Sequence, residues 1–514
     1  MLRVGPALAA SAFLVVACSG KERPPYVPSG DPALEIPYER LPEPAATFEE
    51  QDCDVELDDY AVQCGFVTVP EAPGSERQMK LAVMRIFSNA KEVASDPVIY
   101  LNGGPGGPSL GDAEFYVSTF EPLLEVRDLI LFDQRGTGDS RPELSCTETQ
   151  DDLEEALDGC FERLSSKTDL SATDSVSNAR DVDGVRASFG YEQWNLFGIS
   201  YGTRLGLTVA RDYPAGVRSL IVDSVVPLEI DLIAGIGQNG QNAFELAFSA
   251  CLADAECAEK YPDSIGQLRT TAAQWDAEPA GDLELGGKDL VNVLFSLAYS
   301  PRGIEILPFL VDEVAAGKLA GLERVFGQIG TGSDAFGMHL SLHCAEEVPF
   351  TDEAIVVGAD EAIFPELREG LSGRTYFEYC AHWPVEKAPG SENSAVVSAI
   401  PSLVLSGEFD PVTPPANAAM VHASLSNSQY FNLENESHGA SVGECGLSLV
   451  QAFLDAPNEI VPSTCLGDVP DLEFRSIAPS SAAHTIEGKL RFVTTAPSAD
   501  RLDAIVRDAV ARRR

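Results

Sequence analysis

The sequence predicts an α/β protein with a mostly parallel central sheet, flanking helices and an inserted helical cap domain. Three observations predict this class. Apolar runs closed by turn signals alternate with helical segments, the strand pattern fades between residues 227 and 398, and it then resumes near residue 400. Strands that alternate with helices favour a parallel sheet covered by helices on both faces.

The elements can be assigned in chain order. Four apolar runs look like successive strands, at 65–70 (GFVTVP), 79–87 (MKLAVMRIF), 96–104 (DPVIYLNGG) and 128–138 (DLILFDQRGTG). The alternation continues with a helix at 175–190, a strand at 194–200, a helix at 201–214 and a strand at 217–227. It resumes with strands at 400–411 (IPSLVLSGEFDP) and 428–439 (SQYFNLENESHG), and then a helix at 445–456.

These elements divide the chain into segments. The order is a signal peptide at 1–17, a Pro-rich spacer at 18–50, the first part of the core at 51–226, a helical cap at 227–398, the second part of the core at 399–466 and a tail at 467–514. The tail contains one further strand-like run at 489–495 and a charged helical pattern at 499–514.

Composition limits the function classes. A chain of 514 residues with 44% apolar and 22% charged residues can bury a large core. Its formal net charge of -45 argues against a nucleic-acid partner, because phosphate binding needs basic stripes. The only basic cluster is Arg512, Arg513 and Arg514.

The N-terminus resembles a bacterial lipoprotein signal. A basic start precedes the apolar run ALAASAFLVVA, and the small residue Ala17 stands before Cys18. The run is too short to span a bilayer stably. A buried core helix is the alternative interpretation. The signal predicts an exported protein, anchored to the membrane through lipidated Cys18 on the periplasmic or cell-surface side, with the spacer leading away from the membrane.

Eleven cysteines, less Cys18, leave ten, an even number as expected in an oxidising compartment. They form five sequential pairs with short closed loops, which predicts the disulfides Cys53–Cys64, Cys146–Cys160, Cys251–Cys257, Cys344–Cys380 and Cys445–Cys465. Zinc is the rival use, but only His339, His343 and Cys344 form even a loose group, and a helix beside a disulfide explains these better. We expect no metal.

The motif Gly198-Ile199-Ser200-Tyr201-Gly202 fits G-x-S-x-G and lies between a predicted strand and a predicted helix. Small residues two positions either side of Ser200 permit the sharp turn that exposes a nucleophilic serine in the α/β-hydrolase fold. An ordinary serine in a tight turn is the alternative.

A serine hydroxyl needs a base to take its proton and a carboxylate to orient that base. In this fold the order is serine, acid, histidine, each in a loop after a strand. His438 and Asp410 fit these places, and Asp223, one strand earlier, is the alternative acid. We interpret His382 and His422 as structural, and His484 lies in the tail.

The chain resembles the prolyl and tripeptidyl aminopeptidase family of α/β-hydrolase serine peptidases. The matching motifs are NGGPGG, DQRGTGDS, GISYG, GEFDPVTP and SHG, in the family's order over residues 60 to 466, and Cys445 and Cys465 resemble the secreted tripeptidyl branch. The resemblance implies Ser200 as nucleophile, Asp410 as orienting acid, His438 as general base, and removal of short units from free peptide N-termini. Where many relatives have His, this chain has Asn102, which we expect to leave the main-chain donors intact.

The glycine-rich loop at 103–108 (GGPGGP) completes this interpretation. It lacks the Lys that a phosphate loop needs, and a linker would not follow a strand so directly. We therefore expect N–H groups of Gly103 or Gly104, with that of Tyr201, to form the oxyanion hole. We expect Asp133 and Arg135 to brace this loop.

An aminopeptidase also needs a carboxylate for the substrate's ammonium group. The candidates are Glu346, Glu347 and Glu245, each with a solvated acidic surface as the alternative.

The sequence thus predicts an exported serine exopeptidase acting on peptide substrates, with no cofactor. A carboxylesterase of the same fold is the second hypothesis, and a non-catalytic surface binding protein is the third.

Overall fold

The computed structural model of the chain describes residues 46–57, 59–150, 152–281, 284–326 and 335–475. The expected signal peptide, Cys18 and most of the spacer lie outside the described residues, as do His484 and the strand and helix expected in the tail.

A nine-stranded sheet forms the centre of the fold, in the order β1-β2-β3-β5-β4-β6-β7-β8-β9. Strands β1, β2 and β3 pair antiparallel, as do β3 and β5, and all the pairs from β5 to β9 are parallel. The strands are β1 (Thr47–Gln51), β2 (Val62–Pro70), β3 (Gln78–Ile86), β4 (Val98–Leu101), β5 (Leu129–Phe132), β6 (Trp194–Ile199), β7 (Val217–Asp223), β8 (Ser402–Gly407) and β9 (Ser428–Leu433).

The mostly parallel sheet confirms the predicted fold class, and every strand except β1 overlaps a predicted run, although β2 and β3 begin before theirs. Strand β1 lies in the range assigned to the spacer, so the sheet begins before the expected boundary at residue 51. Its sequence, TFEEQ, is polar and mostly exposed, and it pairs only at the sheet edge. Phe48 is its one partly buried side chain, so this edge strand lacks the alternation that reveals a strand in a sequence.

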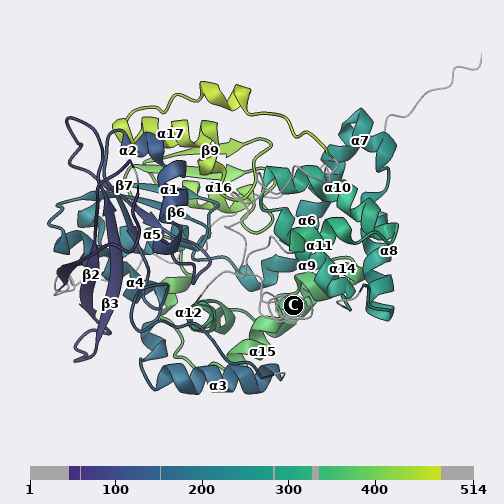
Figure 1. Cartoon of the computed structure of the whole chain (residues 1–514), viewed down its shortest axis with the longest axis horizontal. Coiled ribbons are helices and arrows are strands. Elements are labelled where there is room, and N and C mark those ends of the chain that lie inside the picture. The colour runs from purple at the N-terminus through teal and green to yellow at the C-terminus, as the bar shows by residue number, and fades with distance from the viewer. Residues whose placement is uncertain (1–45, 58, 151, 282–283, 327–334, 476–514) are drawn as a thin grey trace, which may run out of the picture. The chain divides into compact units, whose positions relative to one another are not determined.

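Helices cover both faces of the sheet (Figure 1). On β4, Ile99 and Leu101 join one buried cluster, while Val98 and Tyr100 join the other, as the two-residue period of a strand requires. The helices of the core are α1 (Ala113–Thr119), α2 (Glu121–Leu124), α3 (Leu153–Ser165), α4 (Ser175–Ser188), α5 (Tyr201–Asp212), α16 (Pro415–Ser424) and α17 (Glu444–Asp455).

The insertion between β7 and β8 is helical, as predicted, but its helices serve two different cores. The helices are α6 (Leu232–Ala253), α7 (Ala255–Lys260), α8 (Ser264–Ala277), α9 (Gly287–Leu297), α10 (Pro301–Ala315), α11 (Ala320–Phe326), α12 (Phe336–Leu342), α13 (Glu353–Glu361), α14 (Pro365–Leu371) and α15 (Thr375–Ala381). Helices α6, α8, α9, α10 and α14 pack around their own apolar cluster (Figure 1).

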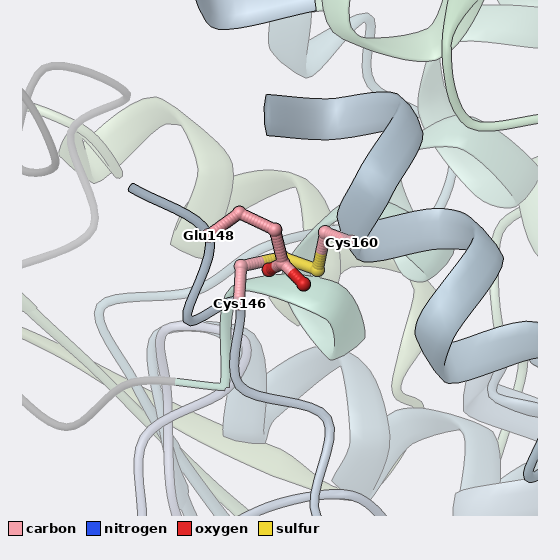
Figure 2. A group of neighbouring side chains, drawn as sticks. All are labelled: Cys146, Glu148 and Cys160. Carbon is pink, nitrogen blue, oxygen red and sulfur yellow. A yellow bond between two sulfur atoms is a disulfide. The ribbon is translucent and has the colours of Figure 1, made fainter. Parts of the chain in front are cut away.

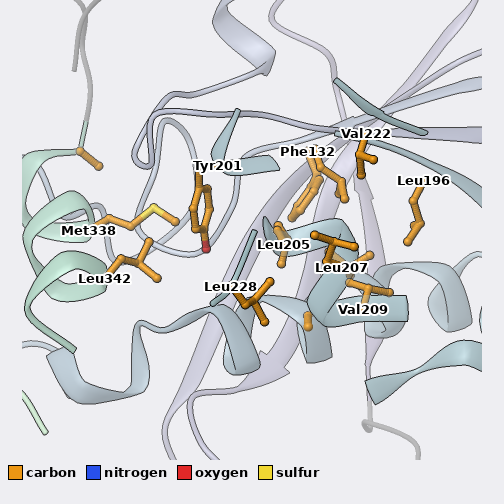
Figure 3. Close-up of a cluster of buried hydrophobic side chains, with 14 of the residues drawn as sticks. Phe132, Leu196, Tyr201, Leu205, Leu207, Val209, Val222, Leu228, Met338 and Leu342 are labelled. Atoms are coloured by element: carbon orange, nitrogen blue, oxygen red, sulfur yellow. The ribbon is translucent and has the colours of Figure 1, made fainter. Parts of the chain in front are cut away.

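Helices α12 and α15 instead contribute to the core of the sheet. Figure 3 shows Met338 and Leu342 pointing toward the ring of Tyr201, the residue after the candidate nucleophile. A π-helical turn at His343–Glu347 follows α12 directly. The second part of the insertion therefore packs against the residue next to Ser200. None of the described helices is long and apolar enough to cross a bilayer.

All five predicted disulfides are present. Four of them close loops of 6 to 20 residues, and Cys344–Cys380 closes the longest, at 36 residues. This last bond connects the π-helical turn to α15. Cross-links of this kind stabilise a fold mainly by restricting the unfolded chain.

Candidate active site

Ser200 occupies the sharp turn between β6 and α5. Its φ of 59° and ψ of -127° place a non-glycine residue in a strained conformation. The Ser200 N–H donates to the carbonyl of Asp223 (3.1 Å), and its own carbonyl accepts the Thr203 N–H (2.9 Å). A Cβ on Gly202 would overlap the carbonyl oxygen of Leu101, so the turn requires glycine there. This geometry is that of a nucleophile elbow.

Asp410 and His438 lie beyond the carboxyl ends of β8 and β9. His438 Nδ1 is 2.9 Å from Asp410 Oδ2, and both side chains are buried. The carbonyl ends of neighbouring parallel strands meet at one edge of a sheet, so β6, β8 and β9 bring the serine, the acid and the histidine to the same edge. The structure thus places the three predicted residues after strands that end at one edge of the sheet, as the fold requires of a triad.

Each member of the acid–base pair shifts the pKa of the other. Burial alone would raise the pKa of Asp410, but His438 and the donors of Thr413 outweigh it and hold that pKa below its ordinary value. Burial alone would lower the pKa of His438, but the Asp410 carboxylate raises it above the ordinary value. Asp410 therefore stays ionised and stabilises the imidazolium that forms when His438 accepts a proton.

Two further residues complete the surroundings of this pair. Thr413 donates its N–H (2.8 Å) and its hydroxyl (2.7 Å) to the Asp410 carboxylate, and the hydroxyl lies 3.3 Å from His438 Nδ1. Tyr299, from the insertion, packs edge-on against the imidazole at 5.0 Å between ring centroids. These contacts hold the imidazole plane in one orientation.

The glycine-rich loop reaches the nucleophile as predicted, but its two glycines differ in role. A Cβ on Gly103 would lie 2.9 Å from Ser200 Cβ, so this glycine permits the close approach. The Gly103 N–H, however, donates to Asn102 Oδ1 (2.9 Å). The Gly104 N–H has no hydrogen bond within the described part of the chain, and Tyr201 is the first residue of its helix. Of the three predicted donors, the N–H groups of Gly104 and Tyr201 are therefore the two without a hydrogen-bond partner among the described residues.

Asn102 consequently does more than the sequence predicted. We expected it to leave the main-chain donors intact, but its side chain accepts the Gly103 N–H while its Nδ2 donates to the Pro108 carbonyl (2.8 Å). An amide can accept and donate at once, so the Asn102 side chain forms hydrogen bonds to both ends of the loop.

The predicted brace from Asp133 is present, whereas that from Arg135 is wrong. Asp133 Oδ1 accepts the N–H groups of Ser109 (2.6 Å) and Leu110 (3.0 Å) at the end of the loop. Arg135 forms a fully buried bidentate pair with Asp181 of α4 instead (both bonds 2.7 Å). The neighbouring Gln134 side chain contacts the start of the loop instead, where it donates to the Asn102 carbonyl (2.9 Å).

Glu346 and Glu347 surround one arginine. Arg204 of α5 pairs with Glu346 through Nε (3.0 Å) and with Glu347 through Nη1 (2.8 Å), and all three side chains are buried. Ser175 also donates its hydroxyl to Glu346 (2.7 Å). Burial raises the pKa of each glutamate to about 7, although Arg204 opposes it.

These contacts separate the three candidates for the substrate's ammonium group. Both oxygens of Glu346 accept hydrogen bonds from Ser175, so Glu346 is a structural residue. The second oxygen of Glu347 has no hydrogen bond to any described residue, and the side chain keeps 6% exposure. Glu245 lies on an exposed face of α6 and accepts from Gln241 (3.2 Å). Glu347 is therefore the buried candidate that keeps an oxygen without a hydrogen bond to a described residue.

Asp223, the alternative acid, binds a neighbour of the histidine rather than the histidine itself. Its Oδ2 accepts the N–H (2.8 Å) and the hydroxyl of Ser441, and the hydroxyl of the next residue, Ser224, accepts the Gly439 N–H (2.8 Å). Burial raises the pKa of this carboxyl. Asp223 therefore supports the loop that carries His438.

Cys146, Glu148 and Cys160 bring two sulfurs and a carboxylate together (Figure 2). The sulfurs are bonded to each other, and Glu148 pairs with Arg163 at 2.6 Å. Metal ions bind thiolates, which a disulfide does not provide. We interpret this group as structural.

Several residues of the site were missed by sequence reasoning. Thr413 had a local signal, because a hydroxyl three residues after an Asp in a Pro-containing turn commonly binds its carboxylate. The contributions of Tyr299 and Arg204 depend on contacts across the chain, and no local pattern indicates them.

The comparisons with known proteins agree with this geometry. A family model described as the alpha/beta hydrolase fold matches residues 96–248, and one described as TAP-like protein matches residues 372–464. Serine protease Hip1 of Mycobacterium tuberculosis is 25% identical over 480 residues, which cover 80% of this chain and 87% of the relative.

Two further relatives differ in their named activities. Tripeptidyl aminopeptidase of Streptomyces coelicolor is 33% identical over 193 residues, or 32% of this chain and 35% of the relative. Carboxylesterase B of M. tuberculosis is 27% identical over 412 residues, or 68% of this chain and 76% of the relative. Together with the nucleophile elbow, these matches identify the chain as a serine hydrolase, an α/β hydrolase with a TAP-like C-terminal region.

Proposed function

We propose that the protein is an exported serine exopeptidase that hydrolyses peptide bonds near the free N-terminus of peptides. The observation that carries the hydrolytic part is the buried Asp410–His438 pair, on the same sheet edge as the Ser200 elbow. Ser200 attacks the scissile carbonyl while His438 takes its proton, and the N–H groups of Gly104 and Tyr201 stabilise the oxyanion. His438 then protonates the leaving amine, and water releases the N-terminal fragment.

The exopeptidase part is supported by Glu347 and by the relatives named tripeptidyl aminopeptidase. A peptide ammonium group that approaches Glu347 would meet a carboxylate whose only ion pair within the described chain is with Arg204. Pairing with a cation favours the ionised carboxylate. Such a group would fix the distance from the substrate N-terminus to Ser200, and so the length of the fragment released.

A peptide library tests this proposal. Matched peptides with free and acetylated N-termini are incubated with the protein and with the Ser200→Ala variant, and the fragments are identified by mass spectrometry. We expect short N-terminal fragments from the free peptides only, and a raised KM for those peptides in Glu347→Gln. Equal cleavage of acetylated peptides would contradict the exopeptidase assignment.

A carboxylesterase is the second candidate, favoured by the match to carboxylesterase B over most of its length. The same triad cleaves esters, so the site alone does not separate the two activities. Parallel assays on a tripeptidyl arylamide and a short-chain aryl ester separate the two activities. Turnover of the ester without turnover of the arylamide would establish the esterase.

Export and lipid anchoring at Cys18 form a separate part of the proposal. They are supported by the signal-like sequence at 1–18 and by five disulfides, which persist in oxidising compartments. Partition into Triton X-114 measures the anchor. The wild type should enter the detergent phase and Cys18→Ala should not. Equal partition of the two proteins would contradict lipidation.

A further inference from the structure

Two histidines of the insertion, His339 and His343, have no role in the site as described above. His339 lies on α12 and is buried, with 3% exposure. Its Nδ1 is 3.2 Å from the carbonyl oxygen of Pro105, in the glycine-rich loop, and its Nε2 is 3.1 Å from the hydroxyl of Tyr376. His339 therefore connects the insertion directly to the loop that forms the oxyanion hole.

The contacts determine which nitrogen of His339 carries the proton. A carbonyl oxygen can only accept, so Nδ1 must donate to Pro105. In the neutral ring Nε2 is then an acceptor, and the Tyr376 hydroxyl donates to it. Burial lowers the pKa of His339 to about 4, although the Pro105 carbonyl opposes the shift, so the ring is neutral near pH 7.

A second contact joins the same two segments. The Ala335 N–H, at the start of α12, donates to the Gly106 carbonyl (3.0 Å). The approach is close, because a Cβ on Gly106 would lie 3.0 Å from the Ala335 oxygen. The insertion thus holds two successive carbonyls, Pro105 and Gly106, immediately after the candidate oxyanion donor Gly104.

The partner of His339 is itself fixed in place. Tyr376 lies on α15, which the Cys344–Cys380 disulfide connects to the π-helical turn after α12. The Phe336 ring stacks on the His339 ring at 5.7 Å, and the Tyr376 ring does so at 5.8 Å. The two hydrogen bonds, to the Pro105 carbonyl and to the Tyr376 hydroxyl, set the orientation of the imidazole, and the ring contacts add packing around it.

We propose that His339 is a positioning residue of the oxyanion hole, whose Nδ1–H holds the Pro105 carbonyl and so keeps the Gly104 N–H aligned with the Tyr201 N–H. Glycine at 103, 104, 106 and 107 would otherwise leave this backbone mobile. The inference rests on the serine hydrolase activity but not on the peptide specificity. A purely structural role for His339, as a packed ring between Phe336 and Tyr376, is the alternative.

Three substitutions of His339 separate the two roles. The amide nitrogen of Asn takes the position of Nδ1, so His339→Asn can keep the bond to Pro105. Gln places its amide near Nε2, and Leu has no donor. With p-nitrophenyl butyrate as substrate, we expect His339→Gln and His339→Leu to lower kcat by about 10- to 100-fold with KM within about threefold, and His339→Asn to retain kcat within about threefold.

Phenylboronic acid provides a second readout, because its tetrahedral adduct on a serine places an oxygen in the oxyanion hole. Its Ki should rise in parallel with the loss of kcat in His339→Gln and His339→Leu. Phe336→Leu removes ring packing but no hydrogen bond, so it should lower the melting temperature and leave kcat and Ki unchanged. Labelling of wild-type Ser200 with a fluorophosphonate reports separately that the hydrolase itself is active.

Three results would overturn the inference in a wild type that is labelled. Wild-type kcat in His339→Leu would show that the bond does not position the loop. If His339→Asn or Phe336→Leu lost as much kcat as His339→Leu, packing alone would explain the effect.

Discussion

Replacing Asp410 with Asn tests the assignment of the triad acid. Asp410 Oδ1 accepts the N–H groups of Val412 (3.0 Å) and Thr413 (2.8 Å), so an Asn must keep its carbonyl oxygen at that position. Its amide nitrogen then takes the place of Oδ2, 2.9 Å from His438 Nδ1, and donates toward the ring. His438 must then protonate Nε2, the nitrogen that should accept the proton of Ser200. We expect kcat to fall by about 10⁴, or about 5.5 kcal/mol of activation free energy.

Asp223→Asn is the matched control, because this carboxylate binds Ser441 and supports the histidine loop. We expect it to lower kcat by no more than about tenfold, as for a supporting hydrogen bond. Both variants are assayed on an aryl ester between pH 5 and 9, with circular dichroism as the measure of folding. Since Asp410 raises the pKa of His438, the rising acid limb of kcat/KM should move to lower pH in Asp410→Asn. A larger loss in Asp223→Asn than in Asp410→Asn would refute the assignment.

Three further predictions follow from other contacts. Thr413→Val should lower kcat by about tenfold while Thr413→Ser retains it, because only Ser keeps the hydroxyl donor to Asp410. Equal kcat values in the two variants would contradict this role. Arg135→Met should lower the free energy of unfolding by about 3 to 5 kcal/mol, as measured by denaturant unfolding, because it leaves Asp181 buried without its partner. The kcat per folded molecule should stay constant. A lower kcat would show that Arg135 does support the glycine-rich loop. The pKa of Glu347 rises from its ordinary 4.5 to about 7, so the folded state binds an extra proton between these pH values. Its stabilisation is complete below pH 4.5 and is lost as pH rises through about 7, by about 3 kcal/mol at about 1.4 kcal/mol per pH unit. Glu347→Gln should therefore gain stability relative to the wild type from pH 5 to pH 8, and a constant difference would contradict the raised pKa.

The centre of the sheet could be predicted because strands β4 to β8 are buried on both faces and closed by turn signals. The apolar runs that became β4, β5 and β6 need no knowledge of their neighbours to be recognised. Strand β1 could not be predicted, because it is polar and is held by pairing with β2 and by the contact of Phe48 with Phe189. The two roles of the insertion were also hidden, because an apolar helix face does not indicate which core it will join.

The residues of the site likewise fall into those that could be predicted from the sequence and those that could not. Ser200, Asp410 and His438 follow strands whose positions in the sheet bring them to one edge, so their order along the chain was informative. The Asn102 side chain accepts the Gly103 N–H, and its direction decides which glycine N–H stays without a partner. The Arg135 side chain pairs with Asp181 rather than with the loop. Such pairings are tertiary contacts that motif spacing does not indicate.

The central claim is that Ser200 is a nucleophile activated by His438. Intact-protein mass spectrometry after incubation with a fluorophosphonate tests it most directly, with tryptic mapping of the adduct. We expect one adduct, on Ser200, in the wild type, and at least about 100-fold slower labelling in His438→Ala, because the general base is lost. An adduct on another residue, or equal labelling of His438→Ala, would contradict it.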